Sequence, residues 1–166
     1  MDKQYQELIS ILQKELAVFQ ELRDLLNAET KPLIEFDAQS LEKITKAKQT
    51  LELRLKILEQ ARLDLLVALI RRFNIQPEKA TLKELARFAP EPQAQILLKT
   101  RDTFKRLTGE MRKKVDGNSQ LAESSLRLLQ GLRGLIQRTI EEPTTYEGAG
   151  QVKARRDSIK VAGRRV

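Results

Sequence analysis

A continuous heptad pattern between residues 41 and 69 constrains the fold of this chain more than any other sequence feature. Its positions alternate at spacings of three and four residues: Leu41, Ile44, Lys48, Leu51, Leu55, Leu58, Arg62, Leu65 and Leu69. Apolar side chains at this spacing occupy the a and d positions of a heptad, which line the side of a helix that packs on another helix. The pattern therefore predicts a long helix in a coiled coil or helical bundle.

Two cations, Lys48 and Arg62, interrupt this pattern at a-type positions. A polar residue there can fix the register between two paired helices, at some cost in stability. Alternatively, either cation binds a ligand. The sequence alone leaves both interpretations open.

Prolines and capping residues divide the first half of the chain. Residues 3–30 repeat leucine and phenylalanine at helical spacing, and Pro32 is expected to end this first helix, followed by a short linker, residues 32–36. Asp37 is the expected N-cap of the second helix, which should end near Asn74.

The second half contains one short and one long predicted helix. The capping box Thr81-Leu82-Lys83-Glu84 begins the short helix, and Pro90 ends it. The long helix is expected from about 92 to 141, and to continue through Gly117 because the heptad phase is kept across it. Its predicted packing positions are Leu97, Arg101, Phe104, Thr108, Met111, Val115, Asn118, Ala122, Ser125, Leu129, Leu132 and Ile136.

These segments predict an all-α protein: an elongated antiparallel bundle or coiled coil of three long helices plus one short helix. Composition agrees, because 40% of residues are hydrophobic but only 4% are aromatic, which is typical of bundles. We expect a helical bundle over residues 1–142, with a binding overhang from about 121, and a flexible tail over residues 143–166.

Positive charge is concentrated in the last 16 residues. Of the net charge of +8, residues 151–166 contribute six cations and one anion, whereas the other 150 residues carry 25 cations and 22 anions. We expect this basic tail to be disordered. It either keeps the protein in solution or contacts an anionic partner.

The residue types present exclude several kinds of chemistry. Histidine and cysteine are absent, which removes imidazole bases, thiol nucleophiles and the commonest metal ligands. The neighbouring carboxylates Glu141 and Glu142 do not face each other on a helix. We therefore expect no enzyme activity, no metal, no cofactor and no small-molecule substrate.

No segment is expected to enter a membrane. The longest apolar-rich run, residues 63–70, is far shorter than the roughly 20 residues that a spanning helix needs. Residues 1–3 lead directly into an amphipathic helix, so we expect no signal peptide. The expected location is the cytoplasm.

Helix lengths predict that residues from about 128 to 141 have no packing partner inside the chain. Apolar residues between 121 and 140 cover about 180° of the helix, more than the roughly 100° that a helix needs to face a core. Such an exposed patch marks an interaction site, unless it packs on its own linker or on a second copy. Gly131 and Gly134 lie away from this apolar arc and should weaken the helix by about 2 kcal/mol together.

The run from Asn118 and Leu121 through the leucines of 126–136 to Pro143-Thr144-Thr145-Tyr146-Glu147-Gly148 resembles the FlgN-like flagellar export chaperones. The resemblance extends to the order of parts: an acidic first helix, a second helix with Lys and Arg, a short Thr-Leu-x-x-Leu segment, and a long last helix. It implies a non-enzymatic protein that binds the C-terminal helices of hook-associated (hook–filament junction) proteins, FlgK and FlgL. Such a chaperone keeps them from assembling in the cytoplasm and escorts them to the flagellar type III export apparatus.

The predicted client-binding residues follow from the apolar arc together with this resemblance. They are Asn118, Leu121, Ser125, Leu128, Leu129, Leu132, Leu135 and Ile136. Asn118 is either a polar layer within the bundle or a hydrogen-bonding group for the client. Tyr146 is either a cap on the helix end or a contact for a second partner, such as the export gate.

Two other classes of protein remain open. One is a coiled-coil scaffold whose leucines pair with a second copy. The other, less favoured, is a basic nucleic-acid-associated helical protein, whose binding would weaken with salt and depend on residues 151–166.

Overall fold

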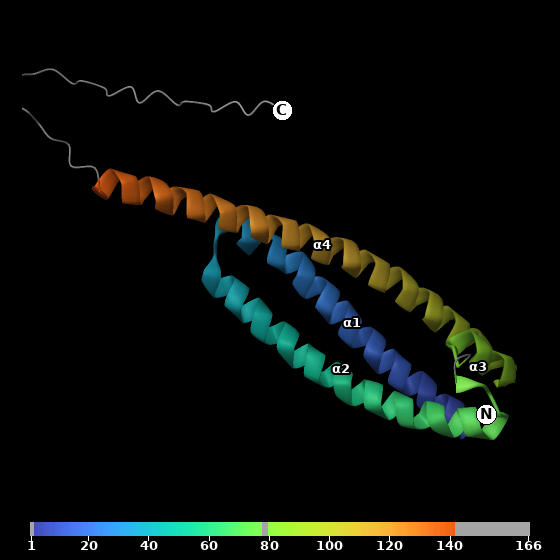
Figure 1. Ribbon diagram of the computed structural model, residues 1–166. Helices are drawn as coiled ribbons and strands as arrows, with labels where there is room; N and C mark the ends of the chain where they lie inside the picture. The colour runs from blue at the N-terminus through green and yellow to red at the C-terminus, as the bar shows by residue number, and fades with distance from the viewer. Residues whose placement is uncertain (1, 78–79, 142–166) are drawn as a thin grey trace, which may run out of the picture. The chain divides into compact units, whose positions relative to one another are not determined.

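The computed structural model describes residues 2–77 and 80–141, and this part of the chain is helical. Four helices follow in order: α1 (Lys3–Glu35), α2 (Ala38–Phe73), α3 (Leu82–Phe88) and α4 (Glu91–Glu141) (Figure 1). The predicted all-α fold of three long helices and one short helix is confirmed. The predicted tail and Tyr146 lie outside the described residues.

The chain divides into two compact units, Met1–Gln130 and Gly131–Val166. The first unit contains α1, α2, α3 and α4 up to Gln130. The described part of the second unit is the rest of α4. The core and the contacts between the helices belong to the first unit.

Helix α1 does not end at Pro32, so that prediction is wrong. Pro32 lies inside the helix, which continues to Glu35 and ends where Phe36 adopts a left-handed conformation with φ of 58°. Proline removes one N–H donor from the helix. The end is nevertheless held, because the backbone N–H groups of Phe36 and Asp37 both donate to the Pro32 carbonyl, the second at 3.0 Å. Residues 32–35 are therefore helix and not linker.

Helix α2 begins and ends as the sequence predicted. The Asp37 carboxylate accepts a hydrogen bond from the Ser40 N–H at 3.0 Å and another from the Ser40 hydroxyl at 2.6 Å. The Ser40 side chain and backbone lower the pKa of Asp37, so the stabilisation from this cap is lost as the pH falls through that lowered pKa. At the other end, Asn74 is left-handed, with φ of 50°, and its N–H donates to the Ile70 carbonyl.

Helix α3 also begins at its predicted cap. The Thr81 hydroxyl accepts a hydrogen bond from the Glu84 N–H at 3.2 Å, which satisfies one free donor of the first turn. The connection after it is short, and α4 begins directly after Pro90.

Two ion pairs set the register between α1 and α2. The Arg62 Nε lies 3.0 Å from a Glu15 oxygen, and the Lys48 Nζ lies 2.6 Å from a Glu29 oxygen. Glu15 and Glu29 are 14 residues apart in α1, as are Lys48 and Arg62 in α2. Both pairs therefore belong to a single antiparallel heptad register. These pairs support the interpretation that Lys48 and Arg62 fix the register. Because each cation is already paired with a glutamate, neither charge is free to bind a ligand.

Helix α4 packs on α1 through a row of residues that differs in part from the predicted one. The buried or partly buried positions are Leu97, Thr100, Phe104, Leu107, Met111, Lys114, Asn118, Leu121 and Ser125, with Arg101 beside them. Thr108, Val115 and Ala122 were predicted to face inward, but they are exposed. Up to Ser125, every second predicted position was thus placed one residue too late along α4, and the positions between them were correct.

The main hydrophobic core lies at one end of this unit. It combines the beginning of α1, the end of α2, α3 and the beginning of α4 (Figure 1). Tyr5 is fully buried there, and its hydroxyl donates to the Leu85 carbonyl at 3.0 Å. Burial, and next the charge of Asp2, raise the pKa of Tyr5. The core residues are Tyr5, Leu8, Ile9, Leu12, Leu69, Ile75, Leu85, Ala86, Ala94 and Leu97.

Candidate protein-binding surface

Away from that core, α1 and α4 are joined by a buried polar layer centred on Asn118. The Asn118 amide nitrogen donates to the Leu26 carbonyl at 2.8 Å and to a Glu29 oxygen at 3.0 Å. Its oxygen accepts a hydrogen bond from the Thr30 hydroxyl at 3.0 Å. Because Glu29 also binds Lys48 of α2, this layer connects all three long helices.

The contact between α1 and α4 extends to the last turns of α1. The Ser125 hydroxyl donates to the Leu33 carbonyl at 3.0 Å. Leu33 lies three residues before the C-cap Phe36. Ser125 therefore lies level with the end of α1, and the leucine-rich residues of α4 follow it in sequence.

The segment of α4 from residue 126 to residue 136 carries large apolar side chains that remain accessible to solvent. We call it the leucine-rich segment. Three of these side chains belong to the first unit and three to the second, and each is between 48% and 61% exposed: Leu126, Leu128, Leu129, Leu132, Leu135 and Ile136. Exposed apolar side chains at this density are uncommon on monomeric proteins and mark interaction sites.

The two glycines of this segment have open space around them. A Cβ atom added at Gly131 or Gly134 would meet no other atom within 4 Å. Packing therefore does not require glycine at either position. Their main effect is therefore to lower the local stability of α4, because glycine has a lower helix propensity than other residues.

The eight predicted contact residues fall into two groups in the structure. Leu128, Leu129, Leu132, Leu135 and Ile136 are exposed, whereas Asn118, Leu121 and Ser125 are buried or partly buried where α4 packs on α1. Asn118 is 5% exposed, and both ends of its amide are bonded inside the chain. Because these three residues already pack within the chain, the surface proposed below consists of the exposed ones.

The sequence did not reveal the partners of Asn118. Glu29 and Thr30 lie 89 and 88 residues away from it, and nothing in the local pattern connects them. A usable signal was the heptad spacing of α1, in which Glu15 and Glu29 occupy equivalent positions among leucines. Leu126 was part of the predicted apolar arc but not of the predicted contact set, although it is as exposed as the others.

Replacing Asn118 should affect folding and not binding. In an Asn118→Ala variant, Glu29 and the Leu26 carbonyl lose a donor, which should lower the free energy of unfolding by about 1–2 kcal/mol. Urea denaturation measures this, with the exposed neighbour Ser119→Ala as control. A variant with unchanged stability but lost partner binding would return Asn118 to the binding surface.

Two features of the described part of the chain bear on the class of protein. No three acidic, histidine or cysteine side chains in it are grouped so that they could hold a metal ion. None of its helices combines the length and the apolar character of a membrane-spanning segment.

Comparison with known protein families decides the assignment. The sequence model of the family described as FlgN protein matches residues 1–154 of the 166. The chain belongs to the FlgN family. No curated protein and no solved structure matches it significantly.

FlgN proteins are flagellar export chaperones, which bind flagellar substrate proteins and are not enzymes. The match covers all four helices, including the leucine-rich segment. An accessible apolar helix face is a suitable feature for a chaperone that binds other proteins.

Proposed function

We propose that this FlgN protein binds the amphipathic C-terminal helices of the hook–filament junction proteins FlgK and FlgL in the cytoplasm. It keeps them from assembling early and delivers them to the flagellar export apparatus. The observation that carries this proposal is the accessible leucine-rich segment, whose six large apolar side chains are each about half exposed.

The spacing of α4 suggests how a client helix is recognised. The row that packs on α1 passes through Asn118, Leu121 and Ser125 at alternating steps of three and four. In the sequence, the same alternation continues through Leu128, Leu132 and Leu135. These leucines have the spacing that knobs-into-holes packing against another helix requires. The client helix is proposed to take the place that α1 takes for the earlier part of the row.

The strength of such a contact comes from several side chains together. Fully burying a leucine contributes about 1.5–3 kcal/mol, so completing the burial of a half-exposed one contributes about 1 kcal/mol. Association has its own entropic cost, which a single leucine cannot offset. The proposal therefore requires the leucine-rich segment to act as a unit.

Sedimentation of the full chain with synthetic C-terminal helices of FlgK and FlgL tests the function. We expect a one-to-one heterodimer with either peptide and a chain that does not associate with itself. A stable homodimer that excludes both peptides would favour the coiled-coil scaffold. Binding to nucleic acid that weakens steeply with salt, and disappears when residues 151–166 are deleted, would favour the nucleic-acid alternative.

The two glycines offer a graded test of how this segment binds. Gly131→Ala and Gly134→Ala should each stabilise the helix by about 1 kcal/mol, because neither new methyl group meets another atom. A client that has to order this segment would then bind about fivefold more tightly per substitution. Calorimetry measures the affinity, and Gly109→Ala, which is also uncrowded, is the matched control. Weaker binding by the alanine variants would show that the client needs the glycines themselves.

Delivery to the export gate requires a second contact. Tyr146 stays our candidate for this contact, with a cap on the helix end as the alternative. It lies outside the described residues, so both interpretations stay open. A Tyr146→Ala variant that binds client peptides normally but no longer supports their export would favour the gate contact.

A further inference from the structure

The middle of α4 is strongly basic, and client binding does not use this charge. Between residues 99 and 114 it carries seven lysines and arginines against two acidic residues, Asp102 and Glu110. The cations are Lys99, Arg101, Lys105, Arg106, Arg112, Lys113 and Lys114. All of them belong to the first unit, outside the leucine-rich segment.

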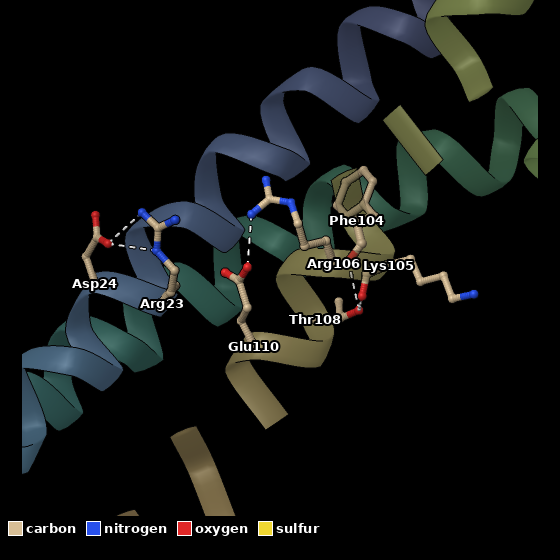
Figure 2. Close-up of polar contacts among 7 residues, drawn as sticks. All are labelled: Arg23, Asp24, Phe104, Lys105, Arg106, Thr108 and Glu110. Atoms are coloured by element: carbon tan, nitrogen blue, oxygen red, sulfur yellow. Dashed lines mark hydrogen bonds and ion pairs between the residues drawn. The ribbon is translucent and has the colours of Figure 1, made fainter. Parts of the chain in front are cut away.

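Helical spacing separates these cations into different sides of α4. Arg101, Lys105 and Arg112 fall within about 40° of one another at 100° per residue, and we call them the basic stripe. Arg106 falls on another side and pairs with Glu110 at 3.0 Å. Figure 2 shows the Lys105 side chain extending away from that pair.

The charge of the basic stripe is largely uncompensated. Lys105 and Arg112 are exposed, and neither forms an ion pair with another described residue. Arg101 contacts only its own neighbour Asp102, at 3.1 Å, and the Asp102 side chain is 67% exposed. An exposed ion pair of this kind contributes little to stability, so Arg101 can leave Asp102 and pair with the carboxylate of a partner.

Arg101, the first residue of the basic stripe, also lines a mostly apolar cavity of about 330 Å³, to which α1, α2, α3 and α4 all contribute. Its walls include Leu12, Phe19, Leu55 and Phe104, together with Arg101 of the basic stripe. The Phe19 and Phe104 rings meet edge to face, with centroids 5.5 Å apart. The two acids that line it, Glu15 and Glu59, both contact Arg62, at 3.0 and 3.8 Å. The cavity therefore offers apolar surface, and its acids are already neutralised.

We propose that the cavity and the basic stripe form a second docking surface, which binds an acidic amphipathic helix of a partner protein. Large apolar side chains of that helix enter the cavity, and its carboxylates pair with Arg101, Lys105 and Arg112. These three cations span 11 residues of α4, or about 16 Å, a length over which a partner helix presents acidic side chains on successive turns. The apolar walls favour a protein helix over nucleic acid, whose phosphates need donors along the whole contact.

A synthetic amphipathic helix, with leucines on one face and glutamates on its flanks, is the probe. It is titrated against a chain that carries Leu128→Asp, Leu132→Asp and Leu135→Asp, so that the leucine-rich segment cannot bind it. To that background we add Arg101→Gln, Lys105→Gln and Arg112→Gln. The matched control adds Lys99→Gln, Arg106→Gln and Lys113→Gln, which remove the same charge from another side of α4.

We expect removal of the basic stripe to weaken probe binding about tenfold or more and the control to weaken it less than about threefold. Because the chain has no cysteine, a fluorophore on Thr108→Cys, next to the basic stripe, should report the same binding event. Circular dichroism confirms that each variant is folded.

Four results would overturn the proposal. The first is equal weakening by both triple substitutions, which would indicate non-specific attraction. The second is equal binding of a probe with glutamine in place of glutamate. The third is tighter, stripe-dependent binding of a DNA duplex at the same salt concentration. The fourth is stripe-dependent dimerisation of the chain, which would make a second copy the occupant.

Discussion

Leu128→Asp, Leu132→Asp and Leu135→Asp together should weaken binding of the FlgK and FlgL helices at least 100-fold while leaving the fold intact. Each substitution removes an apolar contact and places a carboxylate where the client would have to bury it. All three side chains are about half exposed, so replacing them should lower the free energy of unfolding of the free protein only slightly. Calorimetry with the client peptides measures the loss, and thermal melting measures the stability.

The matched control uses the other side of the same segment. Arg127→Asp, Gln130→Asp and Gln137→Asp change the charge at least as much, but at 100° per residue they fall outside the apolar arc. Client affinity should change less than about threefold in this variant. If both triple variants bind equally well, or equally badly, the leucine-rich segment is not the specific binding surface.

Leu97→Ala should destabilise the chain by about 2–5 kcal/mol, the largest stability effect that we expect for a single leucine of α4. Leu97 is fully buried in the core at the beginning of α4, where its loss leaves a cavity. Leu126→Ala is the matched control, because Leu126 lies in the same helix but is 59% exposed. It should cost less than about 0.5 kcal/mol.

Denaturation in urea compares these two variants directly. A large loss of stability for Leu126→Ala would mean that the leucine-rich segment is part of the structural core. In that case exposure would not be a reason to assign it to binding.

The heptad pattern of α2 correctly predicted which of its residues pack inward, whereas the pattern of α4 allowed two solutions. In α2 each packing position is apolar or is one of the two cations that find a glutamate on α1. In α4 either Thr108 and Ala122 or Leu107 and Leu121 can complete the row. The structure uses the leucines, which bury more apolar surface. Comparing the apolar content of the two rows would have predicted the packing side of α4 better than the heptad spacing alone.

Pro32 shows a different limit of sequence reasoning. Its missing N–H indicated a helix end, but tertiary contacts beyond it keep the chain helical. The Leu33 carbonyl accepts a hydrogen bond from Ser125, whose helix is distant in sequence. A local signal cannot anticipate such a contact.

For the candidate surface, composition and spacing identified the residues that the structure leaves exposed, but not those it uses internally. Leu128, Leu129, Leu132, Leu135 and Ile136 are accessible. Asn118, Leu121 and Ser125 share their periodicity but pack where α1 is still present. The difference depends on where α1 ends, and helix lengths had already placed the unpartnered residues from about 128 onward.

Amide hydrogen exchange across residues 126–137, with and without a client helix, tests the central claim most directly. The claim is that the leucine-rich segment is held weakly in the free chain, because its side chains are exposed and two glycines interrupt it, and that it becomes ordered on the client. We predict fast exchange in the free chain and strong protection in the complex, while the core around Leu97 stays protected throughout. Unchanged exchange in this segment on client binding, with new protection elsewhere, would contradict the account.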